Sequence, residues 1–157
     1  MKKHLLLFFI LTFILSCSSD SEDLASIKTS DIMTGTWKVS KKGKIYTDGE
    51  EEITKYYNPD CTEIWNINKD GTLIIDYYKA NDSNQCTLYN SNNDRNWIEF
   101  EDGQISFYWK DIDPYDSFND SRPIITFKEN NEVMRIKIHI SHDSSIKYEF
   151  TDFTRQN

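Results

Sequence analysis

The chain has 157 residues and a formal net charge of -8 at pH 7. This acidity argues against nucleic acid and anionic lipid surfaces as partners, because both attract proteins with a basic patch. Beyond the N-terminal segment about 130 residues remain, which is enough for one domain with one hydrophobic core.

The N-terminus has the features of a secretory signal. Residues 5–15 are almost all apolar, but a helix needs about 20 such residues to span a bilayer. Lys2 and Lys3 precede this stretch, as in a signal peptide. Residues 14–17, Ile-Leu-Ser-Cys, resemble the cleavage motif of bacterial lipoproteins. We predict that residues 1–16 are removed and that Cys17 becomes a lipidated N-terminus carrying acyl chains such as palmitate.

Residues 17–31 read as an acidic tether between the lipid and the domain. Two acyl chains would anchor the protein without a transmembrane helix, because each buried methylene contributes about 0.8 kcal/mol. The segment 18–23, Ser-Ser-Asp-Ser-Glu-Asp, resembles the tag that directs Bacteroidetes lipoproteins to the cell surface. A solvated spacer explains it equally well. We therefore expect an outer-membrane lipoprotein facing either the cell surface or the periplasm.

Two cysteines, Cys61 and Cys86, remain after Cys17 is assigned to the lipid. An even pair in an exported protein favours a disulfide. The alternative is two reduced, buried thiols.

From residue 35 onward the hydrophobic pattern alternates with a period of two, which indicates strands. Residues 35–46 place Trp37 and Val39 on one face, and residues 49–55 read as an exposed turn. Residues 62–78 form two alternating runs around Asp70-Gly71, a strong hairpin signal.

The remaining strands continue this pattern. Residues 96–109 predict a hairpin around Asp102-Gly103, and residues 110–121 a long polar loop. Residues 123–140 predict a third hairpin around Asn130-Asn131, whose second strand puts Met134, Ile136, Ile138 and Ile140 on one face. The last strand, within residues 145–155, places Ile146, Tyr148 and Phe150 on one face. A helical period is absent from residues 32–157, apart from a single turn near residues 31–33.

We predict an all-β domain over residues 32–157: an eight-stranded up-and-down antiparallel barrel. Closure removes exposed strand edges, and eight strands enclose room for side chains or one small ligand. The alternative is a β-sandwich, for which the loop 110–121 offers a crossover between sheets.

Several motifs resemble lipocalins. Gly35-Thr36-Trp37 is similar to the G-x-W opening of that family, and the order of the later hairpins and of Cys61 and Cys86 resembles bacterial lipocalin-like domains of Bacteroidetes lipoproteins. The likeness extends over residues 33–155. It implies a lipocalin-like barrel in which a basic residue of the last strand stacks on the first-strand tryptophan, and Arg155 is the residue placed to do so.

The aromatic residues are the candidates for ligand contact. They form either a packed core or the wall of a cup for a small hydrophobic molecule. We predict ligand binding by a monomer, with a packed barrel that contacts an envelope protein or a glycan as the alternative. The candidate wall residues are Trp37, Trp65, Tyr77, Trp97, Phe107, Tyr148 and Phe150.

We predict no catalytic residue, no metal site and no cofactor. His139 falls on the polar face of its strand and His142 in the following turn, so they are not arranged as a metal pair. The acidic residues of the loop 110–121 lack the glycine and the closing glutamate of a calcium-binding EF-hand loop.

Overall fold

The computed structural model describes residues 28–113 and 122–156. Its strands belong to one antiparallel sheet in the order β6-β5-β4-β3-β1-β9-β8-β7, with β2 also paired to β1. The elements are α1 (Thr29–Met33), β1 (Gly35–Tyr46), β2 (Glu51–Tyr56), β3 (Glu63–Ile67), β4 (Thr72–Ala80), β5 (Cys86–Glu99), β6 (Ile105–Trp109), β7 (Ile124–Lys128), β8 (Val133–His139) and β9 (Ile146–Arg155).

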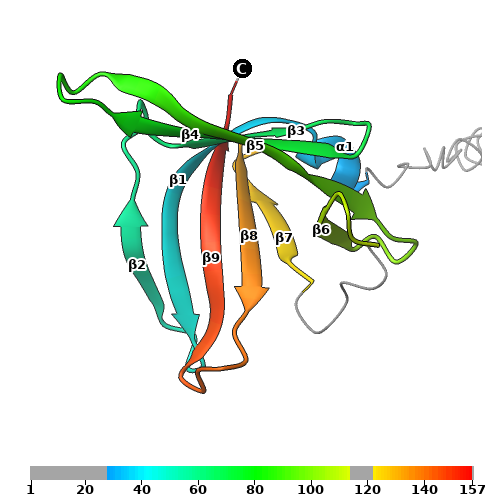
Figure 1. Ribbon diagram of the computed structural model, residues 1–157. Helices are drawn as coiled ribbons and strands as arrows, with labels where there is room; N and C mark the ends of the chain where they lie inside the picture. Colours follow the sequence, from blue (N-terminus) through cyan, green and yellow to red (C-terminus); the bar gives the residue numbers. More distant parts are fainter. Residues whose placement is uncertain (1–27, 114–121, 157) are drawn as a thin grey trace, which may run out of the picture.

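The sheet curls into an eight-stranded, nearly closed barrel of the lipocalin-like, up-and-down kind (Figure 1). β2 and β3 follow one another along the same edge of β1, β3 beside its first half and β2 beside its second. Together they occupy one of the eight positions around the barrel. β6 and β7 end the hydrogen-bonded path. A single curled sheet excludes the two-layer sandwich.

The three predicted hairpins are confirmed. β3 pairs with β4 around Asp70-Gly71, and β5 pairs with β6 around Asp102-Gly103. β7 pairs with β8 around Asn130 and Asn131, whose φ angles of 54° and 70° give the left-handed conformation that tight hairpins need.

One element differs from the prediction. Residues 49–55 were expected to form an exposed turn, but Glu51–Tyr56 is strand β2. Five of its six residues are exposed, so it lacks the alternating apolar residues that reveal a strand in a sequence. Backbone pairing with β1 holds it in place.

The predicted disulfide between Cys61 and Cys86 is confirmed. It joins the segment between β2 and β3 to the start of β5. There β4 and β5 extend beyond the barrel as an arm (Figure 1). The bridge therefore ties the arm, next to the turn that joins β4 to β5, to the segment between β2 and β3.

Candidate functional site

One end of the barrel is closed by α1 and filled by the core. Met33, the buried residue of α1, is fully buried, as is Trp37, whose Nε1 donates to the Met33 carbonyl at 2.7 Å. The Arg155 guanidinium lies 4.4 Å from the centre of the Trp37 ring, which confirms the predicted stacking. Arg155 also donates to the carbonyls of Ile32 and Thr34, so it holds α1 over this end.

Gly35 makes this close approach possible. Its φ of +134° lies in a region that disfavours side chains, and a Cβ there would meet the Arg155 guanidinium at 3.1 Å. The glycine and the tryptophan of the G-x-W motif thus serve the same contact with Arg155.

A β-bulge in β1 determines what lines the other end. The register with β9 shifts between Val39 and Lys41, so that Val39 pairs with Phe153 but Lys41 pairs with Asp152. Such an extra residue reverses which face the following side chains occupy. Trp37 and Val39 point into the core, and beyond the bulge Lys42 and Lys44 border the interior.

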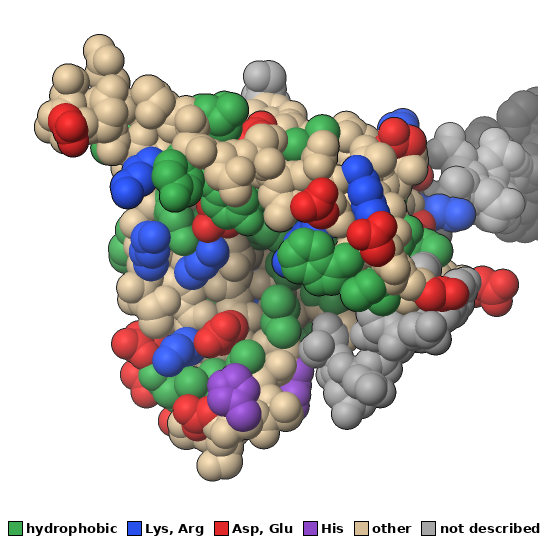
Figure 2. Space-filling model, viewed as in Figure 1, with side chains coloured by type: hydrophobic (Ala, Val, Ile, Leu, Met, Phe, Trp, Pro, Cys, Tyr) green, Lys and Arg blue, Asp and Glu red, His purple; other side chains and the backbone are tan. Residues whose placement is uncertain are grey.

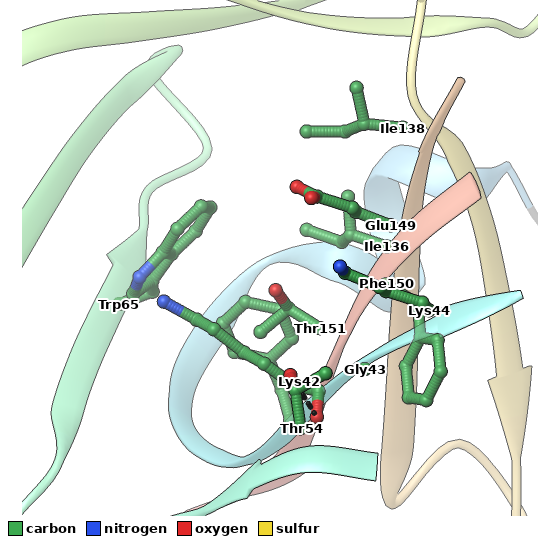
Figure 3. A pocket seen from close by; sticks show the side chains of 11 residues that line it. Lys42, Gly43, Lys44, Thr54, Trp65, Ile136, Ile138, Glu149, Phe150 and Thr151 are labelled. Atoms are coloured by element: carbon green, nitrogen blue, oxygen red, sulfur yellow. Dashed lines mark hydrogen bonds between the residues drawn. The ribbon is translucent and has the colours of Figure 1, made fainter. Parts of the chain in front are cut away.

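These lysines border a cavity of about 330 Å³ at the open end of the barrel. Lysine, threonine and glutamate side chains form part of its wall, and aromatic and aliphatic side chains form the rest (Figure 3). Figure 2, in the orientation of Figure 1, shows charged side chains of both signs spread over the visible face and the histidines at its lower end. The lining residues are Lys42, Gly43, Lys44, Thr54, Trp65, Ile136, Ile138, Glu149, Phe150, Thr151 and Phe153.

Trp65 is the predicted wall residue whose ring lies between the cavity and the core. Its ring contacts Phe107 edge-on at a centroid distance of 5.7 Å and Phe153 at 4.9 Å. Its Nε1 is buried, and among the described residues no acceptor lies within hydrogen-bond distance.

Lys42 carries its charge within an ion pair at the cavity wall. Its Nζ lies 2.9 Å from Glu63 Oε1 and 5.4 Å from the centre of the Tyr57 ring. Burial opposes the charge, but the hydrogen bond and attraction from Glu63 outweigh it, so the pKa of Lys42 lies above its ordinary 10.5.

Four other predicted wall residues belong to the packed core. Trp37 and Trp97 are buried in it, and Tyr77 and Phe107 pack against it while partly buried. None of them is among the residues that line the cavity. The packed-core interpretation holds for this end of the barrel, and the cup interpretation is limited to the region around Trp65.

Tyr148 and Phe150 were predicted to face inward, but they lie on the outer face of β9. Successive side chains of a strand alternate between faces. Phe153 belongs to the core, so Phe150 and Tyr148 point the other way. Phe150 borders the cavity, yet its ring points away from Trp65 (Figure 3) and lies under the Arg135 guanidinium at 4.1 Å.

The sequence pattern identified only part of the cavity wall. Ile136 and Ile138 belong to the alternating run of residues 134–140 and do line the cavity. The inward position of Lys42 and Lys44 depends on the bulge, for which residues 38–44 give no readable pattern. Cys17 lies outside the described residues.

Within residues 28–113 and 122–156, no helix has the length and apolar character needed to cross a bilayer.

In the same part of the chain, histidine, cysteine and acidic side chains nowhere gather in a group of three suited to a metal ion.

Comparison with protein-family models, curated proteins and solved structures gives no match to this chain.

Proposed function

We propose that this protein is a lipid-anchored lipoprotein of the bacterial envelope, related to bacterial lipocalin-like domains, whose barrel binds a small hydrophobic molecule. The observation that carries this proposal is the 330 Å³ cavity inside the open end of the barrel. Pockets that bind small molecules have volumes of about 300–1,000 Å³, so this cavity suits a compact ligand.

The cavity wall supports an apolar occupant. Trp65, Phe153, Ile136 and Ile138 line it, and Trp65 and Phe153 pack against each other. Transfer of apolar ligand surface from water to this wall is favourable by about 25 cal/mol per Å². Binding by this means is passive and needs neither a catalytic residue nor a cofactor.

The proposed anchor would attach at the closed end. α1, the first described element, lies at that end (Figure 1), and Cys17 precedes it in the sequence. The cavity lies beyond the bulge, toward the second half of β1. With a lipid on Cys17, the cavity would therefore lie at the end of the barrel that is remote from the attachment point.

A fluorescence titration tests the proposal. The purified protein is titrated with fatty acids, haem and bile acids while tryptophan emission is followed. Because Trp65 lies at the cavity, we expect one of these ligands to change the emission saturably. A flat response to all of them would instead favour a solid barrel.

Two matched variants locate the binding site. Thr151→Phe adds a ring at the cavity wall, whereas Thr154→Phe adds one at an exposed position of the same strand. We expect Thr151→Phe to abolish the saturable change and Thr154→Phe to retain it. Equal binding by both variants would place the ligand elsewhere.

A second candidate function is an interaction module that contacts an envelope protein or a glycan. The observation that favours it is the arm, where Leu88 is 55% and Tyr89 73% exposed. Aromatic side chains of this kind are enriched at protein interfaces. Stoichiometric recovery of one protein with the membrane-anchored chain, lost in a Leu88→Ser/Tyr89→Ser variant, would support this function.

A further inference from the structure

We infer that the ligand of the cavity is an acidic amphiphile, with an apolar tail in the barrel and an anionic oxygen group between Trp65 Nε1 and Lys42 Nζ. This inference rests on the proposed function, because it assigns the chemical class of the ligand that the cavity binds.

The first observation is the indole donor of Trp65. It is buried at the cavity wall, and no described residue accepts its hydrogen bond. Trp37 and Trp97, in contrast, donate to the carbonyls of Met33 and Asn68 at 2.7 and 2.8 Å. A buried donor without an acceptor is unfavourable, so a ligand oxygen that reached this N–H would make a hydrogen bond that the described residues leave unmade.

The second observation is the neighbouring ammonium of Lys42. Figure 3 shows its amino group pointing toward the indole nitrogen of Trp65. An ammonium group has three donors, and the hydrogen bond to Glu63 at 2.9 Å uses one of them. A carboxylate oxygen near Trp65 would therefore find an indole N–H and a charged N–H donor on the same wall.

The third observation is the charge of the cavity lining. Lys42 and Lys44 line the cavity with one acidic residue, Glu149, which is opposite Lys44 in the register. Lys44 and Glu149 lie beyond ion-pair distance, since no such contact within 4.0 Å occurs between these two described residues. Counting Glu63, which pairs with Lys42, this wall is electrically neutral in a protein whose net charge is -8, and the ammonium of Lys44 has no carboxylate within ion-pair distance among the described residues.

The rest of the lining suits a tail of moderate length. Ile136, Ile138 and Phe153 contribute apolar surface. The cavity of 330 Å³ corresponds to the liquid volume of roughly eleven water molecules. Decanoate, with twelve non-hydrogen atoms, is therefore a suitable probe.

The test compares three probes with the same ten-carbon tail. Calorimetry measures the affinity of the purified full chain for decanoate, decanol and decyltrimethylammonium at pH 8. We expect decanoate to bind at least tenfold more tightly than decanol and the cation to bind most weakly. Equal affinities for decanoate and decanol would overturn the acidic group and leave the hydrophobic cavity standing. Absence of binding by all three probes, together with a flat response to fatty acids, haem and bile acids, would instead reject the proposed function itself.

Two pairs of variants test the assigned donors. Trp65→Phe keeps an aromatic ring but removes the N–H, and Trp109→Phe is its control outside the lining. We expect Trp65→Phe to weaken decanoate binding about tenfold, because the hydrogen bond from the indole N–H to the charged carboxylate is lost, and Trp109→Phe to leave the affinity unchanged. Lys42→Gln combined with Glu63→Gln removes both charges of the ion pair, and should abolish the preference for decanoate over decanol.

Lys38→Gln is the control for the lysine, because Lys38 lies on β1 before the bulge and does not line the cavity. An unchanged decanoate affinity in Trp65→Phe, or an unchanged preference in the double variant, would overturn the assignment. The series of probes on the unaltered protein remains decisive about the ligand's charge even where a variant folds poorly.

Discussion

Arg135 on β8 and Asp152 on β9 form a buried ion pair on the outer face of the barrel. The inner face of the same two strands lines the cavity. Two hydrogen bonds of 2.6 and 2.9 Å join the guanidinium to the carboxylate, and a third reaches Glu51 at 2.7 Å. The ring of Phe150 lies beneath the guanidinium. The hydrogen bonds to Asp152 outweigh the burial of Arg135 and raise the pKa of Arg135 above its ordinary value, so its guanidinium keeps its positive charge.

We expect Arg135→Met to destabilise the protein by about 3–5 kcal/mol, because it leaves the buried Asp152 carboxylate without its main partner. Lys41, at 3.4 Å, remains as a weaker partner. Urea unfolding measures the change, and Lys137→Met on the same face of β8 is the control, with an expected effect within about 0.5 kcal/mol. Equal losses for the two variants would contradict the structural role given to Arg135.

The same residues show what a sequence cannot reveal at this scale. The alternation in residues 145–155 correctly groups Tyr148 and Phe150 on one face, but it does not say which face is inside, and the register shift between Tyr148 and Ile146 interrupts the alternation. Phe150 is only 2% exposed, although it lies outside the core cluster. The Arg135 guanidinium covers one side of the Phe150 ring, and the absence of a side chain at Gly43 leaves space for the ring. That cover comes from distant strands and has no local signature.

At the scale of the elements, β1 connects the closed end of the barrel to the cavity. Its first half carries the tryptophan that is held by Arg155, and its second half, beyond the bulge, carries the lysines of the cavity. Gly43 lies between these lysines, and a Cβ there would meet the Phe150 ring at 2.6 Å and the Glu52 carbonyl oxygen at 2.3 Å. The hairpins were predictable because Asp-Gly and Asn-Asn turns have local signatures, whereas a bulge has none.

The disulfide between Cys61 and Cys86 belongs to this scale because it joins two elements across 25 residues of chain. We expect the double variant Cys61→Ala/Cys86→Ala to lose about 3–4 kcal/mol of stability, by the entropy of closing a loop of that length. Denaturant unfolding with and without reductant measures it: reduction should bring the unaltered protein to the stability of the variant and leave the variant unchanged. An oxidised protein no more stable than the variant would contradict this role.

For the whole molecule, the up-and-down barrel was predictable from the alternating period and the short turns of residues 35–155. The distribution of its interior was not. Trp37 and Trp97 fill the closed end while Trp65 faces a cavity, a division that depends on the bulge in β1 and on the placement of α1. Aromatic residues that look alike in the sequence thus have different roles.

The proposed anchoring is tested by changing one residue. Cys17→Ala removes the only thiol at the predicted cleavage motif, so we expect the protein to leave the membrane fraction on washing with high salt. Fractionation followed by immunoblotting measures this, with Cys61→Ala/Cys86→Ala as the cysteine control that should stay bound. Undiminished membrane association of Cys17→Ala would reject lipid anchoring.

The most direct measurement of the central claim is the ¹H–¹⁵N spectrum of the indole N–H groups of the protein's four tryptophans during titration with decanoate. Trp65 Nε1 lies at the cavity without an acceptor among the described residues, while Trp37 and Trp97 donate to backbone carbonyls. We predict that the Trp65 resonance shifts strongly and saturably and that those of Trp37 and Trp97 stay nearly in place. A Trp65 resonance unmoved by saturating decanoate would contradict a ligand site for an acidic amphiphile at Trp65.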